Sequence, residues 1–113
     1  MANSRVARGR KTQTLIAEWF RAHGCPNAEP CEAFLPGVDV RNVPGLAIEV
    51  KATAKGDLLA ALRQATANAD DSGCQTPVVV WRPNGYGEQR IEEWVVAMTL
   101  KDFTTMYQQT QGE

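Results

Sequence analysis

The fifteen residues from Gly37 to Lys51, GVDVRNVPGLAIEVK, decide the fold. Apolar and polar residues alternate over 38–43 and again over 46–51, which is typical of half-buried β-strands. Between these runs Pro44 presets φ and Gly45 permits a positive φ, a combination that favours a tight turn. The stretch is therefore predicted to form a β-hairpin.

Three charged side chains on this hairpin point to chemistry: Asp39 on the first strand, and Glu49 and Lys51 on the second. Successive side chains on a strand face opposite ways, so Glu49 and Lys51 share one face about 7 Å apart, while Val50 faces the core. Two carboxylates that converge from neighbouring strands repel each other unless a cation lies between them, and Mg²⁺ suits an oxygen site with few protein ligands. Such an ion polarises a phosphate and lowers the pKa of a bound water. Lys51 would orient this water or offset the negative charge that develops on the phosphate. The pattern indicates a metal-dependent phosphodiester hydrolase; the alternative is a solvated hairpin face with a cross-strand ion pair.

The hairpin register carries a condition on this site. Asp39 faces Glu49 only if paired residue numbers add up to 88. A plain two-residue turn at Pro44-Gly45 pairs Val43 with Leu46, whose numbers add up to 89, and sends the two carboxylates to opposite faces. The site therefore requires a β-bulge, which we expect at Gly45, or a three-residue loop.

Periodicity and capping residues predict the other elements. Asp57 is expected to cap one helix and Thr99 another, and the apolar run from Pro77 to Trp81 is typical of a central strand covered on both faces. The predicted helices span 10–23, 58–72 and 100–108, and the predicted strands span 30–35, 38–43, 46–51, 77–81 and 91–98. Their order, α-β-β-β-α-β-β-α, predicts an α/β fold in which a small mixed sheet is flanked by helices.

Composition limits the class of protein. With 113 residues, 43% apolar and 22% charged, the chain is predicted to form a single domain, 1–113, and not a disordered segment. No apolar run approaches the roughly 18 residues needed to cross a bilayer, and the basic start has no apolar run behind it, so we expect a cytoplasmic protein with no membrane partner. Cys25, Cys31 and Cys74 lack paired zinc-ligand spacing and are expected to be reduced thiols.

The charge is unevenly distributed. Residues 1–23 carry five basic side chains and one acidic side chain, a net +4, whereas residues 24–113 carry seven basic and twelve acidic ones, a net −5. A short basic arm, 1–11, on an acidic body suggests a polyanionic partner, and a solubilising tail is the alternative.

Two motifs resemble a known family. Gly37-Val38-Asp39-Val40 and Ile48-Glu49-Val50-Lys51, with Gly9 near the start of the first helix, resemble the PD-(D/E)XK nuclease superfamily, and within it the archaeal and phage-type Holliday junction resolvase-like endonucleases. The resemblance covers about residues 5–108, and Val38 stands where the superfamily name has a proline. It implies a restriction-endonuclease-like fold.

The same resemblance implies roles for individual residues. Asp39 and Glu49 would be Mg²⁺ ligands, with Mn²⁺ as a possible substitute, and Lys51 would be the catalytic lysine. The family also places a Glu or Gln on the first helix. Aligning the glycines that flank this helix puts Gln13 at that position, at the edge of the apolar stripe, whereas Glu18 points to solvent. An ordinary polar residue at the helix boundary is the alternative for Gln13.

Related nucleases often carry a Gln or Tyr that faces the site from the helix after the catalytic lysine. Gln64 occupies this region, next to the buried stripe of the predicted helix 58–72. A supporting role there is open, but we expect Gln64 to be an ordinary surface residue.

These inferences predict a Mg²⁺-dependent DNA endonuclease that hydrolyses phosphodiester bonds in branched DNA, in the manner of a Holliday junction resolvase. Because the chain has no room for a separate recognition domain, specificity is expected to come from DNA shape. The DNA-binding cations are expected to be Arg5, Arg8, Arg10, Lys11 and Arg41.

Two alternatives remain for the function: a nicking or repair nuclease on other branched or damaged DNA, and a catalytically inactive DNA-binding protein with the same fold. Since symmetric cutting of a junction needs two active sites, a homodimer is expected. Its interface would be either the closing helix or the edge formed by Val78–Trp81.

Overall fold

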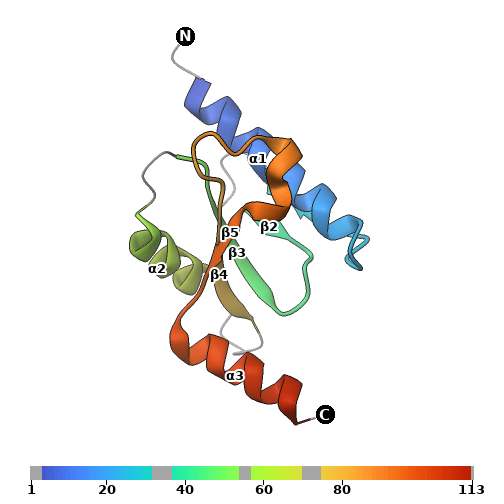
Figure 1. Cartoon of the computed structure of the whole chain (residues 1–113), viewed down its shortest axis with the longest axis vertical. Coiled ribbons are helices and arrows are strands. Elements are labelled where there is room, and N and C mark those ends of the chain that lie inside the picture. The colour runs from blue at the N-terminus through green and yellow to red at the C-terminus, as the bar shows by residue number, and fades with distance from the viewer. Residues whose placement is uncertain (1–3, 32–36, 54–56, 70–74, 113) are drawn as a thin grey trace.

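The predicted hairpin lies in the middle of the β-sheet. In the computed structural model, β2 (Val40–Arg41) and β3 (Leu46–Lys51) pair antiparallel. The structure describes residues 4–31, 37–53, 57–69 and 75–112. Residues 4 and 5 are described by their backbone alone. The other elements are α1 (Ser4–Arg21), β1 (Glu29–Pro30), α2 (Leu58–Asn68), β4 (Thr76–Trp81), the 3-10 helix η1 (Glu88–Glu93), β5 (Val95–Ala97) and α3 (Leu100–Gln111) (Figure 1).

The five strands form one open mixed sheet in sequence order, β1-β2-β3-β4-β5. Neighbouring strands run antiparallel except β3 and β4, which are parallel. A parallel pair needs a crossover connection, and α2 provides it. The predicted α/β class, with a small mixed sheet flanked by helices, is confirmed.

The register of the hairpin changes between its turn and its strands. At the turn, the N–H of Leu46 donates to the carbonyl of Val43 at 3.1 Å, so the residues that face each other have numbers that add up to 89. Farther along, Val40 pairs with Ile48, and these numbers add up to 88. One extra residue on the first strand is therefore taken up between the turn and β2.

This extra residue forms the predicted β-bulge, but not where we expected it. Arg41 and Asn42 together oppose Ala47, and Asn42 has a φ of +66°, in the left-handed region that Asn tolerates better than most residues. Gly45, with a φ of +87°, belongs to the tight turn itself. The bulge thus lies at Asn42 and not at Gly45, because the turn already uses the conformational freedom of Gly45.

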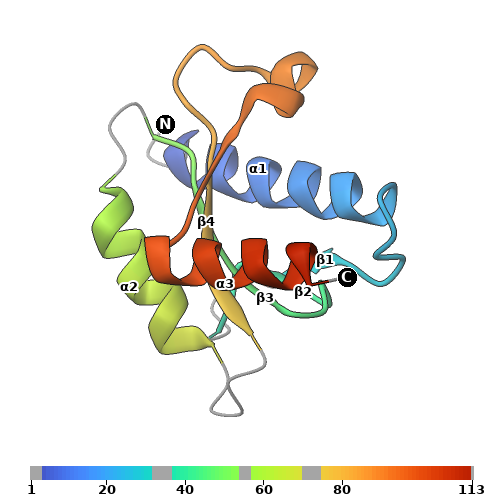
Figure 2. The same ribbon diagram turned by 60° about the horizontal axis from the view of Figure 1, so that its bottom comes forward.

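Different helices cover the two faces of the sheet (Figures 1 and 2). Leu15 and Ile16 of α1 share one buried core with Val40, Ile48, Val78, Val80 and Trp94. Since side chains alternate along a strand, the residues between these positions face the other way. On that second face α2 packs against β3 and β4, where its Ala61 and Ala65 are buried.

The strand β4 is central, as its apolar sequence predicted. Val78, Val79 and Val80 are buried, and β4 lies between β3 and β5. A strand with neighbours on both sides has no free backbone groups for edge-on pairing. The expectation that a Val78–Trp81 edge could form a dimer interface is therefore wrong.

The helix α1 begins earlier than predicted, at Ser4 and not at residue 10. Most of the expected basic arm is therefore helical, because no proline interrupts residues 4–11 and Gly9 alone does not stop a helix. The hydroxyl of Thr12 donates to the carbonyl of Arg8 at 2.7 Å within this helix. Among the residues that the structure describes, no helix has both the length and the apolar character required to cross a membrane.

The predicted caps of the other two helices are confirmed. The N–H of Ala60 donates to the side chain of Asp57 at 2.9 Å, and the N–H of Asp102 donates to Thr99 Oγ1 at 3.0 Å. The predicted end of α2 at residue 72 is wrong, because the helix ends at Asn68, where the chain reaches a run of poor helix formers. Gly73, the expected stop, lies outside the described residues.

Three predicted strands differ from the structure. Residues 88–93 form η1, in which the guanidinium of Arg90 pairs with the carboxylate of Glu93 at 2.9 Å, an i,i+3 contact that a strand does not allow. Only Val95–Ala97 of the predicted strand 91–98 are extended, as β5. The bulge shortens β2 relative to the predicted 38–43, and most of the predicted strand 30–35 lies outside the described residues.

Asn42 provides a test of the bulge. Asn42→Val places a β-branched side chain at a positive φ, and we expect it to lower the free energy of unfolding by about 1–2 kcal/mol. Asn42→Gly, which suits this conformation, should stay within about 0.5 kcal/mol of the wild type. Urea unfolding followed by circular dichroism measures both variants. Equal destabilisation by Val and Gly would contradict the assigned backbone conformation.

Candidate active site

Asp39 lies at the start of the hairpin and is bound to β3 by two hydrogen bonds. Its backbone N–H donates to the carbonyl of Ile48, and its Oδ2 accepts from the N–H of Val50, both at 2.8 Å. The second bond turns the carboxylate toward β3. Asp39 therefore occupies the same face of the sheet as Glu49, as the shifted register requires.

Asp39, Glu49 and Lys51 line one pocket of about 450 Å³ between the hairpin and α2. Two small residues of α2, Ala60 and Ala61, form part of the opposite wall. The remaining lining residues are Gly37, Gln64 and Asn68. The three side chains that the hairpin motif singled out are thus brought together.

The two carboxyl groups of the pocket interact directly, and this changes their acidity. The pKa of Glu49 is raised from 4.5 to about 7, chiefly because burial removes water, and further because Asp39 is negatively charged and hydrogen-bonds to it. Lys51 opposes this shift. Burial also raises the pKa of Asp39, although the hydrogen bond from Val50 lowers it. The pair therefore retains a proton close to neutral pH.

A proton held between two carboxylates marks a position that a cation can take. Among the described residues, no group of three or more His, Cys, Asp or Glu side chains gathers around one point, so the pocket offers two carboxylates. This donor set fits Mg²⁺, which is commonly bound by one or two carboxylates, several waters and substrate phosphates. It fits Mn²⁺ for the same reason and does not resemble a zinc site.

Gln13 does not line the pocket. It is half-buried on α1, the helix that packs on the face of the sheet opposite to Asp39 and Glu49. The apolar stripe of α1 was predicted correctly, but a stripe does not say which face of the sheet it will cover. Glu18 is exposed, as expected.

The pocket amides come from α2. Gln64 is exposed, as expected for a surface residue, and it also lines the pocket, in the supporting position that the sequence left open. Asn68 also lines it, and its Nδ2 donates to the carbonyl of Gly37 at 2.9 Å, which holds α2 against the segment that leads into Asp39. Their four-residue spacing, which puts both on one helix face, is the signal that could have identified them.

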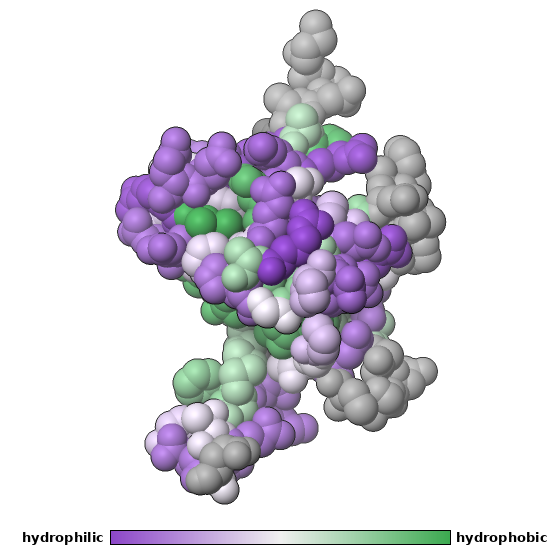
Figure 3. All heavy atoms as spheres, turned by 90° about the vertical axis from the view of Figure 1, so that its right-hand side faces the viewer, coloured by the Kyte–Doolittle hydropathy of each residue, from purple (hydrophilic) through white to green (hydrophobic). Residues whose placement is uncertain are grey.

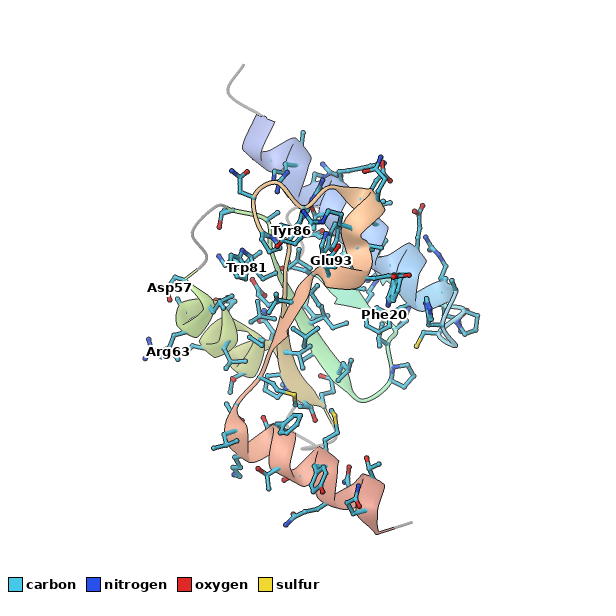
Figure 4. The ribbon with its side chains drawn as sticks, in the orientation of Figure 1. Phe20, Asp57, Arg63, Trp81, Tyr86 and Glu93 are labelled. Carbon is cyan, nitrogen blue, oxygen red and sulfur yellow. The ribbon has the colours of Figure 1, made fainter. Side chains whose placement is uncertain are left out.

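Two more residues of α2 and β4 are seen in Figure 4. Arg63 points away from the sheet into solvent. Trp81 is the register partner of Lys51, and its indole N–H donates to the carbonyl of Thr53 at 3.0 Å (Figure 4). The end of β3 is thereby fixed to the end of β4 beside the pocket.

The predicted DNA-binding cations differ in their surroundings. Arg10 and Lys11 are exposed on α1. Arg8 is partly engaged, because its Nε donates to the carbonyl of Ala52 at 2.8 Å, one residue after Lys51. Arg41 forms an ion pair with Glu29 at 2.8 Å. The side chain of Arg5 lies outside the described part of the chain.

Another basic residue, Arg82, connects three segments of the chain near the pocket. Its backbone N–H donates to the carbonyl of Lys51 at 2.8 Å, and its Nη1 donates to the hydroxyl of the buried Thr12 at 3.0 Å. The guanidinium also lies 5.1 Å from the ring centroid of Trp94. Its place directly after an apolar strand was the available signal, and it holds the end of β3 against α1.

Comparisons of the chain with protein-family models, with curated proteins and with solved structures found no match.

The raised pKa of Glu49 predicts how the stability of the metal-free protein depends on pH. Between about pH 4.5, where the unfolded carboxyl ionises, and about pH 7, the folded protein binds more protons than the unfolded chain. The contribution of Glu49 to the free energy of unfolding is therefore present at low pH and is lost as the pH rises through this window. We expect wild type to lose melting temperature relative to Glu49→Gln as the pH rises from about 4.5 to about 7.

Thermal unfolding followed by circular dichroism in EDTA measures this difference. Glu18→Gln is the matched control, since Glu18 is exposed on α1, and its curve should run parallel to that of the wild type. A Glu49→Gln curve that also runs parallel would show that Glu49 titrates normally.

Proposed function

We propose that this chain is a Mg²⁺-dependent DNA endonuclease that hydrolyses phosphodiester bonds. The observation that carries the proposal is the convergence of Asp39, Glu49 and Lys51 on one pocket, with the two carboxyl groups in contact. A surface hairpin with a simple cross-strand ion pair would not raise the pKa of Glu49 to about 7. The resemblance of the hairpin motif to the PD-(D/E)XK nucleases supports the same activity.

The residues of the pocket have distinct roles in this proposal. Asp39 and Glu49 hold the divalent ion, and the hydrogen bond from Val50 to Asp39 fixes the direction of that carboxylate. The bound ion supplies Lewis acidity to the scissile phosphate and a lower pKa to a coordinated water. Lys51 orients the attacking water or offsets the negative charge that develops on the phosphoryl oxygens. Gln64 lies on the α2 wall, where its amide can hydrogen-bond a phosphate oxygen or a water.

The proposed substrate is branched DNA, with a four-way junction as the first candidate. The exposed Arg10 and Lys11 on α1 are suited to contact phosphates, which contributes affinity independent of base sequence. Arg8 anchors the N-terminal half of this helix to the end of β3, because its Nε donates to the carbonyl of Ala52, one residue after Lys51. A nuclease that nicks or repairs other branched or damaged DNA is the alternative substrate assignment.

A different class of function is favoured by one observation. Gln13 is outside the pocket, so the described residues supply two carboxylates and no third group from α1. A DNA-binding protein without catalytic activity would be consistent with this reduced donor set. Divalent metal distinguishes the two classes, because only the enzyme requires it for a chemical step.

Cleavage of a synthetic four-way junction tests the proposed activity. We expect cutting with Mg²⁺ or Mn²⁺ and none with EDTA, and we expect Glu49→Ala and Lys51→Ala each to lower the cleavage rate by at least about 100-fold. Junction binding, measured by gel shift in Ca²⁺, should persist in both variants. Matched controls are Glu18→Ala and Lys101→Ala, whose side chains are exposed and do not line the pocket.

A panel of junction, flap, single-strand and linear duplex substrates separates the alternatives. Preference for the junction supports the resolvase-like assignment, and equal cutting of linear duplex rejects it while retaining the nuclease. Binding without cutting of any substrate in either metal would assign the chain to the non-catalytic class.

Metal binding has a readout that does not depend on activity. At about pH 7.5, 10 mM Mg²⁺ should stabilise the wild type by about 1.4 kcal/mol if Kd is about 1 mM, because ligand binding to the folded state raises its stability. Glu49→Gln should abolish the stabilisation, and Glu18→Gln should retain it. Differential scanning calorimetry measures the shift, and equal stabilisation of all three proteins would contradict a metal site at Glu49.

A further inference from the structure

The strand β5 leaves one edge of the sheet open. Within the described part of the chain it pairs with β4 and has no neighbour on its other side. The opposite edge strand, β1, is two residues long, and one of these is Pro30, which has no backbone N–H. Val95–Ala97 contains neither proline nor lysine, with which natural edge strands often prevent pairing with another chain. The edge at β5 is therefore able to accept a further strand.

The hydrogen bonds of β4 indicate which backbone groups of β5 face the open side. The N–H groups of Thr76 and Arg82 donate to carbonyls at the two ends of β3, at 2.7 and 2.8 Å. Since backbone groups alternate along a strand, Val80, at an even spacing from both, also directs its N–H and C=O toward β3. Val80 is the register partner of Val96. Val96 therefore points its own N–H and C=O away from β4, toward the open side.

An apolar pocket of about 220 Å³ lies beside Val96. Its most buried residues are Ile16, Val80 and Trp94, which are 9% exposed or less. Val96 is 57% exposed and Glu92 is exposed as well, so the pocket opens toward the edge at β5. β5 runs from η1 to α3 (Figure 1), and Figure 3 shows apolar atoms, in green, between the hydrophilic upper part of the molecule and α3. An apolar cavity of roughly 150 Å³ holds a benzene ring, so this pocket has room for one large apolar side chain.

One acidic side chain sets the charge of this pocket. Glu92 is the only ionisable residue among the described residues that line it. The neighbouring Glu93 is paired with Arg90, whereas neither of the two ion pairs in the described ranges uses Glu92. A phosphate backbone or an anionic lipid surface would be repelled here, and a Lys or Arg side chain would be attracted. The complementary partner is therefore a basic and partly apolar protein segment.

We propose that β5 binds an extended segment of a partner protein as an added strand, with a large apolar side chain in the pocket and a basic side chain beside Glu92. The residue opposite Val96 exchanges two backbone hydrogen bonds with it, and its side chain lies on the same face about 5 Å away, over the pocket. Residues two places farther along share that face. The recognised pattern is an apolar residue with a basic residue two positions away, and the main-chain bonds contribute affinity while the pocket contributes specificity.

Two peptides of identical composition test this pattern. In acetyl-TKVFVKT-amide the two lysines share the face of the phenylalanine, whereas in acetyl-TVKFKVT-amide they lie on the other face. We expect the wild type to bind the first peptide at least about tenfold more tightly, because only its lysines reach Glu92. The peptides contain no tryptophan, and Trp19 and Trp94 line the pocket, so the tryptophan fluorescence of the protein follows the titration.

Val96→Pro tests the added strand. Proline removes the N–H that faces the open side and leaves the hydrogen bonds to β4 in place, which is why edge strands tolerate it. We expect this variant to bind acetyl-TKVFVKT-amide about tenfold more weakly, with a circular dichroism spectrum like that of the wild type. Val96→Thr is the matched control, since it keeps the N–H and the β-branched shape, and its Kd should stay within about threefold of the wild type.

A charge reversal tests the role of Glu92 at a position where folding is not at risk. Glu92→Lys should lose the preference for acetyl-TKVFVKT-amide and bind acetyl-TEVFVET-amide instead, because the ion pair is restored with opposite signs. Glu18→Lys is the matched control. Glu18 is exposed on α1 and does not line this pocket, so its variant should bind both peptides like the wild type.

Three results would overturn the proposal. These are no binding of acetyl-TKVFVKT-amide by the wild type at about 1 mM peptide, equal binding of the two peptides of identical composition, and unchanged binding by a folded Val96→Pro variant. The inference depends on β5 and η1 and not on the proposed nuclease activity, so peptide binding and DNA cleavage can fail independently.

Discussion

The register of the central hairpin is the constraint on which the candidate site depends. Since side chains alternate along a strand, a slip of one residue would move Asp39 from the face of Glu49 to the face covered by α1. The bulge at Asn42 prevents this slip by absorbing one residue between the turn and β2. The hydrogen bond from Val50 to the carboxylate of Asp39 then holds the two strands in that alignment.

The carboxyl pair shows how the protein maintains an unfavourable arrangement. Burial and mutual repulsion raise the pKa of Glu49, so in the absence of a metal the pair is tolerated by keeping a proton. In the proposed nuclease, a divalent cation would satisfy the same two groups with more charge and would compete with that proton. Its affinity would weaken as the pH falls below about 7, in step with protonation of Glu49.

Structural features that local sequence patterns determine were predicted correctly, whereas features that depend on tertiary packing were not. The strand 46–51 and the caps Asp57 and Thr99 follow from alternation and from short-range hydrogen bonds, and they were confirmed. The bulge was required by arithmetic, but its position at Asn42 depended on which residue adopts a positive φ. Gln13 was assigned to the site from the family resemblance and from its place at the edge of a helical stripe, and periodicity contains no information about which face of the sheet a helix covers.

The contacts at the end of β3 join segments that are far apart along the chain. Arg82 bonds both to the carbonyl of Lys51 and to Thr12, seventy residues earlier, while Arg8 bonds to Ala52. The backbone at Lys51 and Ala52, next to the side chain that the proposed reaction uses, is thus held by the first helix and by the segment after β4 at once. A partly unfolded chain lacks one of these supports, so Lys51 is brought beside Asp39 and Glu49 only on completion of the tertiary structure.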